Sequence, residues 1–86
     1  MTLTDQIKQS ITKKSNLTWQ EIISSSKYTK SFYVRMIIAY RLKNVLKPKD
    51  IARIVNRNRT TVYYYLNHYY TEFHNNREFR ELSDKL

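Results

Sequence analysis

The sequence contains no cysteine, no glycine and only one proline, Pro48. Without cysteine the chain can form no disulfide, thiolate metal site or thiol nucleophile. Without glycine it lacks the residue that tight hairpin turns in a small β-protein usually need. It also cannot contain the glycine-rich phosphate-binding loop, GxxxxGKS or GxxxxGKT, of many ATPases. These absences favour an all-α fold, and they exclude thiol chemistry and this class of nucleotide hydrolysis.

Long apolar segments are missing as well. The longest run, MIIAY, is far shorter than the roughly 20 residues that a membrane-spanning helix needs. The segment MTLTDQIKQS at the N-terminus lacks the apolar core of a signal peptide. The 86 residues suit one domain, residues 1–86, with a modest core. We therefore expect a single cytoplasmic domain that has no membrane partner.

Acidic residues are scarce in the middle of the chain, and this scarcity locates the positive charge. The chain has 16 lysines and arginines against seven acids, for a net charge of +9. Between residues 27 and 59, ten basic residues accompany a single acid, Asp50, whereas the charges nearly balance after Tyr70. This uneven distribution is typical of a surface that binds a polyanion. A solvated, lysine-rich surface is the alternative.

Local signals predict where the first three helices begin. Thr4 is expected to cap a first helix that ends near KKSN. Thr18 and Glu21 have the spacing of a capping box, in which each side chain satisfies a free backbone N–H of the other, and they predict a short second helix. After a loop at KYTK, Ser31 is expected to cap the longest helix. Because apolar residues surround most of that helix, it should be the most buried element.

The next two helices fit a helix-turn-helix. Pro48 suits the first turn of a helix that stops at Asn56, and Asn58 can cap the helix that follows. Ala52, Asn56 and Val62 fall where this motif uses a small residue, a turn residue and a β-branched anchor. We therefore predict an all-α, compact bundle of five to six helices that contains this motif.

The motif should span about residues 48–73, followed by a closing amphipathic helix over about residues 76–86. At 100° per residue, one side of its second helix carries large apolar and aromatic side chains that lie within about 60° of one another and should face the core. These are Val62, Leu66, Tyr69 and Phe73, with Tyr65 and Tyr70 at the edges. The opposite side is polar and carries Thr60, Tyr64, Asn67 and Thr71, flanked by Thr61, Tyr63 and His68.

The start of this second helix has side chains that are suited to DNA. Arg59 could bind guanine O6 and N7 with two hydrogen bonds, and a threonine methyl can contact the methyl group of thymine. Backbone N–H groups and the helix dipole attract phosphate at such a helix start. Asn58 could read adenine or cap the helix. The alternative is that Asn58 and Thr60 only cap the helix and that the arginines are solvated.

The segment IARIVNRNRTTV, residues 51–62, resembles the signature of a known family, which reads approximately Ile-Gly-x-x-Phe-Gly-Gly-Arg-Asp-His-Thr-Thr-Val. The family is the C-terminal DNA-binding domain (domain IV) of the bacterial replication initiator DnaA, a TrpR-like helix-turn-helix. The segments LTWQEIISS, VRMIIAYRL and EFHNNREFRELSDKL also resemble parts of that domain, in the same order. The resemblance therefore covers nearly the whole chain.

The resemblance implies that the chain binds double-stranded DNA. It places Arg57 to Thr61 in the major groove or on phosphate, Lys30 near the minor groove, and Lys47 and Lys49 on the DNA backbone. The turn is one residue shorter than in the family, and Asn58 and Arg59 stand where the family has Asp and His. Those two positions read bases, so the resemblance does not specify a DNA sequence. The full set of expected DNA-binding residues is Lys27, Lys30, Lys47, Lys49, Arg57, Asn58, Arg59, Thr60, Thr61, Tyr64, Asn67 and His68.

Our leading hypothesis is a stand-alone, sequence-specific DNA-binding protein that acts in transcription regulation or replication control without ATPase activity. It would work in the bacterial nucleoid, or in the host cytoplasm if a phage encodes it. We expect no cofactor and no metal, and the sequence leaves open whether it is a monomer or a dimer.

The main alternative is a protein–protein adaptor that uses Phe79, Leu82 and Leu86 of the C-terminal helix, unless these residues close the core. An enzyme is not expected. His68 and His74 are six residues apart and do not share a helix face, and Asp50 is the lone acid of the basic region.

Overall fold

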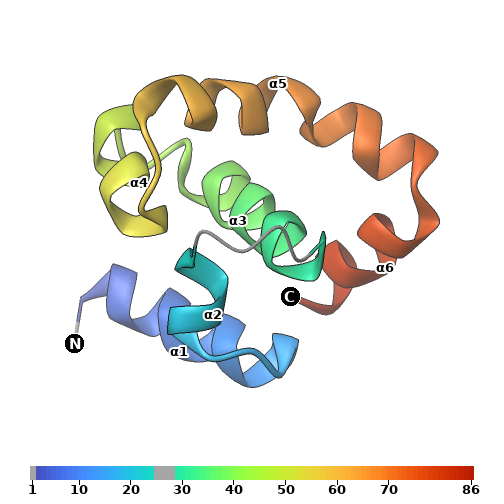
Figure 1. The fold of residues 1–86 in the computed structure, drawn as a ribbon, viewed down its shortest axis with the longest axis horizontal. Helices are drawn as coiled ribbons and strands as arrows, with labels where there is room; N and C mark the ends of the chain where they lie inside the picture. Colours follow the sequence, from blue (N-terminus) through green and yellow to red (C-terminus); the bar gives the residue numbers. More distant parts are fainter. Residues whose placement is uncertain (1, 25–28) are drawn as a thin grey trace.

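The computed structural model describes residues 2–24 and 29–86, and these residues form helices and connecting turns without a strand (Figure 1). The helices are α1 (Leu3–Ser15), α2 (Trp19–Ile23), α3 (Thr29–Leu42), α4 (Pro48–Val55), α5 (Arg59–Asn75) and α6 (Arg77–Lys85). The prediction of an all-α bundle of five to six helices is confirmed. In the described part of the chain, no helix has both the length and the apolar character that crossing a bilayer requires.

The third helix, α3, forms the centre of the molecule. In Figure 1 it lies below α5, with α4 and α6 at its two ends and with α1 and α2 on the opposite side. Its buried side chains point in most directions around the helix, and they are Ser31, Val34, Arg35, Met36, Ile37, Ile38, Ala39 and Leu42. The prediction that this helix is the most buried is therefore confirmed. The prediction that it is the longest is wrong, because α3 has 14 residues and α5 has 17.

Two of the predicted helix starts are also wrong, by two residues for α1 and by three for α3. Thr2, not Thr4, caps α1, and its hydroxyl accepts a hydrogen bond from the backbone N–H of Asp5 at 3.1 Å. This start places the Asp5 carboxylate in the first turn, where the helix dipole favours negative charge. The helix α3 begins at Thr29, so Ser31 lies inside its first turn and is buried.

The predicted capping box of α2 is confirmed in both directions. The Thr18 hydroxyl accepts from the N–H of Glu21, and the Glu21 carboxylate accepts from the N–H of Thr18, each at 3.1 Å. A helix of only five residues has few hydrogen bonds of its own. The contacts at its ends are therefore important for holding it in place.

The helix-turn-helix forms as its local signals predict. Pro48 occupies the first turn of α4, where its missing N–H costs no hydrogen bond. The helix ends at Asn56, which adopts the left-handed conformation with φ 57° and ψ 47°. The Asn58 side chain then caps α5. Ala52 and Val62 are buried where α4 and α5 meet.

The last helix, α6, closes the core opposite α4. Phe79 is fully buried and packs edge-on against the rings of Tyr33 and Tyr69, with centroids 5.2 and 5.4 Å apart. The Ser83 hydroxyl lies 2.6 Å from the Tyr69 hydroxyl, and Leu86 is buried. The apolar face of α6 is therefore part of the core, as one of the two interpretations of the sequence had it.

Candidate nucleic-acid interface

The orientation of α5 decides which of its side chains face solvent. Val62 and Tyr69 are buried, and Leu66 and Phe73 are half-buried, as the predicted core stripe requires. The two tyrosines predicted at its edges differ from each other, because Tyr65 is fully inside the core whereas Tyr70 is 57% exposed. On the opposite side Thr60, Tyr64, Asn67 and His68 are all exposed. This exposed set of side chains is called the outer face of α5 below.

The outer face combines hydroxyl, amide and aromatic groups without negative charge. Tyr63 and Tyr64 are 48% and 49% exposed, and the ring of Tyr64 lies against that of His68 with centroids 4.1 Å apart. The first acid of α5 is Glu72, more than three turns after the start of the helix. The half of α5 that follows the turn therefore repels no anion.

Both helices of the helix-turn-helix carry basic side chains that the structure leaves in solvent. Lys47, Lys49, Arg53 and Arg59 are all exposed. Within residues 2–24 and 29–86, the ion pair that forms is Arg77–Glu81 on α6, so none of these four cations is neutralised by a carboxylate. They lie on α4, at its N-cap and at the start of α5, the two packed helices of the helix-turn-helix, and we call them the basic rim. An anion that reaches this rim would displace no internal partner.

Arg53 belongs to this rim although we did not predict it as a DNA-binding residue. It follows Lys49 by four residues on α4, and residues at this spacing lie on the same face of a helix. The spacing was visible in the sequence. It could have identified Arg53 once α4 had been assigned.

Asn58 and Thr61 are engaged with each other at the start of α5. The Asn58 side-chain oxygen accepts from the backbone N–H of Thr61 at 2.8 Å and from its hydroxyl at 3.0 Å. The capping role that the sequence allowed for Asn58 is therefore confirmed. Thr60 has no part in this cap, and its side chain is exposed. Arg59 and Thr60 are the two side chains of the first turn that remain open to a partner.

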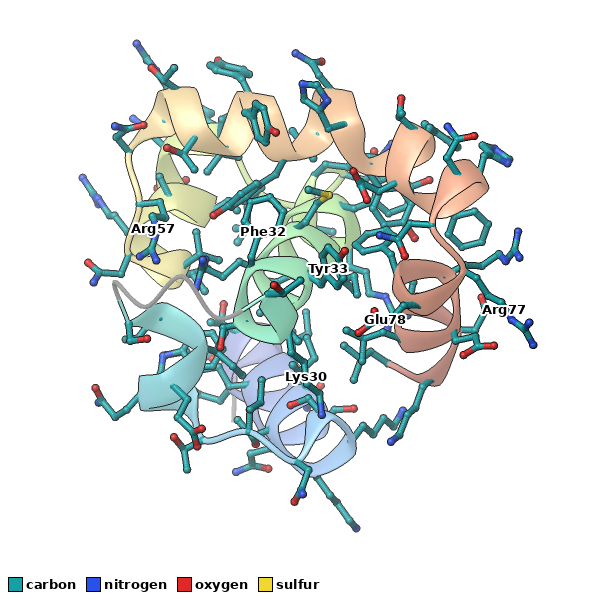
Figure 2. The ribbon with its side chains drawn as sticks, turned by 45° about the vertical axis from the view of Figure 1, so that its right-hand side comes forward. Lys30, Phe32, Tyr33, Arg57, Arg77 and Glu78 are labelled. Atoms are coloured by element: carbon teal, nitrogen blue, oxygen red, sulfur yellow. The ribbon has the colours of Figure 1, made fainter. Side chains whose placement is uncertain are left out.

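Arg57 was expected to contact DNA, but in the structure its side chain makes hydrogen bonds within the protein. Its side chain is half-buried, and its guanidinium donates to the backbone carbonyls of Ile23, at 3.2 Å, and Ser24. It also donates to the carbonyl of Asn56 at 2.8 Å. Figure 2 shows Arg57 between the helix-turn-helix and α2. The described geometry thus engages this guanidinium in hydrogen bonds within the protein.

Lys30 also lies away from the basic rim. It is half-buried at the start of α3 and lines a groove of about 290 Å³ together with Glu78, Glu81, Leu82 and Lys85. Figure 2 shows Lys30 and Glu78 on the α6 side of the molecule, apart from Arg57. The expected minor-groove lysine therefore shares a groove with two glutamates, a leucine and a lysine of α6 and is not part of the basic rim. Lys27, the other expected contact of that region, lies outside the described residues.

The second half of α5 carries an aromatic cluster with α3. The ring of Tyr40 stacks on Tyr69 at 3.8 Å, and the Tyr40 and Tyr70 hydroxyls are 3.1 Å apart. This hydrogen bond, with smaller contributions from burial and the neighbouring phenols, raises the pKa of Tyr40 above its usual value of 10.0. The Lys43 ammonium lies 4.2 Å from the centre of the Tyr40 ring.

An open groove of about 650 Å³ borders this cluster, lined by Tyr40, Arg41, Lys43, Asn44, Tyr69, Phe73, Ser83 and Asp84. Its two cations already have partners. Lys43 lies over the Tyr40 ring, and Arg41 donates to the backbone carbonyls of Ser83 and Leu86 at the end of α6. The groove is therefore a weaker anion site than the basic rim.

Residues 2–24 and 29–86 contain no cluster of three or more histidine, cysteine or acidic side chains that could bind a metal ion. No model of a known protein family matches the chain, and no curated protein matches its sequence. The resemblance to domain IV of the initiator therefore stays a prediction, and it is carried by residues 51–62 and by the order of the segments around them.

Proposed function

We propose that this chain is a sequence-specific, double-stranded-DNA-binding module that inserts α5 into the major groove. The observation that carries the proposal is the combination of the exposed outer face of α5 with the adjoining basic rim. An α-helix fits the width of the major groove, and a polar face without acids can approach base edges and phosphates there. The described contacts leave this face unoccupied by the rest of the protein.

Base reading is assigned to the first turn of α5 and the turn that follows it. Arg59 and Thr60 are exposed at the helix start, and Tyr64, Asn67 and His68 continue the same side. Arginine discriminates guanine through O6 and N7, and threonine can contact the thymine methyl. Asn58 and Thr61 support the helix start through their mutual cap.

Phosphate binding is assigned to the basic rim of Lys47, Lys49, Arg53 and Arg59. Lys47 and Lys49 lie at the start of α4, where a helix-turn-helix usually crosses the DNA backbone. If about five phosphates are neutralised, the logarithm of affinity falls against the logarithm of salt concentration with a slope near −4 to −5. Such a module would act in transcription regulation or replication control, with no ATPase activity of its own.

The adaptor alternative is less well supported than DNA binding. It depends on a free apolar face on α6, but Phe79 and Leu86 are buried and Leu82 is half-buried. Docking a partner through these residues would require opening the core. The outer surface of α6 is charged and holds the Arg77–Glu81 ion pair.

Selection from a pool of random duplexes, followed by footprinting, tests the proposal. We expect one enriched motif, whose symmetry would also show whether one or two copies bind. The double variant Arg59→Ala/Thr60→Ala should lose the motif while staying folded, and Arg80→Ala on α6 is the matched exposed-arginine control. Enrichment of no motif, or retention of the motif by the double variant, would rule out the assigned recognition helix.

A further inference from the structure

The C-terminal end of α2 is held by side chains that come from distant parts of the chain. The last carbonyls of a helix have no partner within it, and in a helix of five residues these are most of the carbonyls. Arg57 donates to the carbonyls of Ile23 and Ser24. The Asn56 side-chain amide adds a longer hydrogen bond to Ile23, at 3.4 Å. The turn of the helix-turn-helix is thus fastened to the end of α2.

A second arginine connects the same end of α2 to the second turn of α5. Arg35 is only 4% exposed, and its guanidinium donates to the carbonyl of Ile22 at 2.7 Å. It also donates through Nε to the hydroxyl of Tyr65 at 3.1 Å. Tyr65 lies on the buried side of α5, opposite the outer face. The end of α2 is therefore joined by Arg57 to the turn just before α5 and by Arg35 to the second turn of α5.

Neither arginine has a carboxylate partner among residues 2–24 and 29–86. Their charges are instead placed at the negative end of a helix dipole, which stabilises cations. Several N–H groups of one rigid guanidinium can hold several carbonyls at a fixed geometry. Arginine is suited to this role, whereas lysine offers a single flexible ammonium.

We infer that Arg57 is a positioning residue for DNA binding, which fixes the start of α5 against α2, and that it is not itself a phosphate contact. The inference rests on the proposed function and refines it, because the resemblance places this arginine on the DNA. A phosphate could bind the Arg57 guanidinium only if the hydrogen bonds of Arg57 to the carbonyls of Ile23 and Ser24 were broken. Loss of that clamp would release α2 and shift Arg59, two residues further on.

The substitution Arg57→Lys distinguishes a phosphate contact from a positioning role. It keeps the positive charge but removes the guanidinium, whose several N–H groups hold the two carbonyls. A phosphate contact would survive it in large part, whereas a clamp on two carbonyls would not. Arg57→Gln removes the charge as well. Arg53→Gln is the matched control, since Arg53 is an exposed arginine of the basic rim with no internal hydrogen bond to lose.

The experiment measures the affinity of each variant for the enriched duplex over a range of salt concentrations. We expect Arg57→Lys and Arg57→Gln to weaken binding to a similar degree, on the order of tenfold, with the salt slope of the wild type. Arg53→Gln should instead lower the steepness of the slope by about 1, as the loss of one phosphate contact does. Wild-type affinity in Arg57→Lys, together with a shallower slope in Arg57→Gln, would overturn the inference.

Hydrogen exchange provides a readout that does not depend on DNA. The Ile22 amide donates within α2 to the Thr18 carbonyl at 3.1 Å, and it should exchange faster in Arg57→Lys but not in Arg53→Gln. Unchanged exchange at Ile22 in Arg57→Lys would overturn the clamp. If the wild type bound no duplex at all, the proposed DNA-binding function would be wrong. Faster exchange at Ile22 in Arg57→Lys would still support the clamp on α2.

Discussion

The helix-turn-helix and the last helix, α6, both carry arginines, but the side chains around those arginines differ. Arg59 at the start of α5 is exposed and has no carboxylate near it in the described part of the chain. Arg77 on α6 pairs with Glu81 at 3.0 Å, and the same helix buries Phe79 in the core. The first region is open to an anionic partner, whereas Arg77 of the second region already has one. Only positive charge that the structure leaves unpaired is available to bind an anionic partner.

The same distinction applies inside the basic middle of the sequence. Arg35 and Arg57 donate to the end of α2, and Arg41 donates to the end of α6. These three arginines stabilise helix ends, so they add to the net charge without extending the basic rim. The rim is consequently smaller than the ten basic residues between 27 and 59 indicate.

Of the predicted changes, the greatest is a loss of stability when the core contact of α6 is removed and the basic rim is left unchanged. Phe79→Ala removes a fully buried aromatic ring from between Tyr33 and Tyr69 and should lower the free energy of unfolding by about 3–5 kcal/mol. Urea unfolding followed by circular dichroism measures this loss. Arg80→Ala, one residue away and exposed, should change it by less than about 0.5 kcal/mol. Equal effects of both variants would show that α6 is not part of the core.

The next effect concerns recognition and leaves folding intact. Arg59→Ala should reduce the binding free energy for the preferred duplex by about 1–3 kcal/mol and relax selectivity at one base pair. Its free energy of unfolding should stay within about 0.5 kcal/mol of the wild type, because the side chain is exposed. Titration of the preferred duplex measures the binding free energy, a repeated duplex selection measures the selectivity, and urea unfolding measures the stability. Uniform weakening on all sequences would reassign Arg59 to phosphate.

The cap of α5 should have a smaller and purely structural effect. Asn58→Ala removes the acceptor for the Thr61 N–H and should cost about 1 kcal/mol of stability. Asn58→Gly is the matched control, since glycine is tolerated at a helix N-cap and should cost only a few tenths of a kcal/mol. Thermal unfolding of the two variants side by side tests this. A glycine variant as unstable as the alanine variant would argue against the cap.

Lys49→Ala should weaken binding to all duplexes alike, by a few-fold. It removes one exposed cation from the basic rim, so the steepness of the salt slope should drop by about 1. Lys85→Ala on α6 keeps the same net charge as Lys49→Ala but lies outside the rim. If both lysine variants lowered the slope equally, general charge would account for binding and the rim would have no special part.

The smallest effect lies in the aromatic cluster and depends on pH. Because the hydrogen bond with Tyr70 raises the pKa of Tyr40 above 10.0, the folded state favours the neutral phenol. This contribution to stability is complete below pH 10.0 and is lost as the pH rises through the folded-state pKa. Tyr40→Phe should therefore lose stability less steeply than the wild type above pH 10.0. Parallel unfolding curves for the two proteins would contradict this.

Most of the fold could be predicted from short-range signals. The Thr18–Glu21 box, the left-handed Asn56 and the Asn58 cap each depend on residues within three positions of one another. The central position of α3 followed from its apolar residues on all sides. The choice between Thr2 and Thr4 was missed, because both can cap and the sequence does not rank them.

The candidate site was harder to predict than the fold. The residues that differ from the prediction do so because of contacts with distant parts of the chain. Arg57 binds a carbonyl that is 34 residues earlier in the chain, and only the packed position of α2 brings the two together. The resemblance places Lys30 near the minor groove, but in the structure it lines a groove with α6 residues about 50 positions away in sequence. Spacing along one helix predicts which side chains share a face. It does not predict which helix end an arginine will reach.

A single titration shows whether the outer face of α5 and the basic rim bind duplex DNA. Fluorescently labelled duplex is titrated with the protein from about 50 to 200 mM salt, for the wild type and for Arg59→Ala/Thr60→Ala. We predict binding with a slope near −4 to −5 for the wild type, and a clear loss of preference for the selected motif in the double variant. Absence of binding to any duplex at the lowest salt concentration would contradict the account.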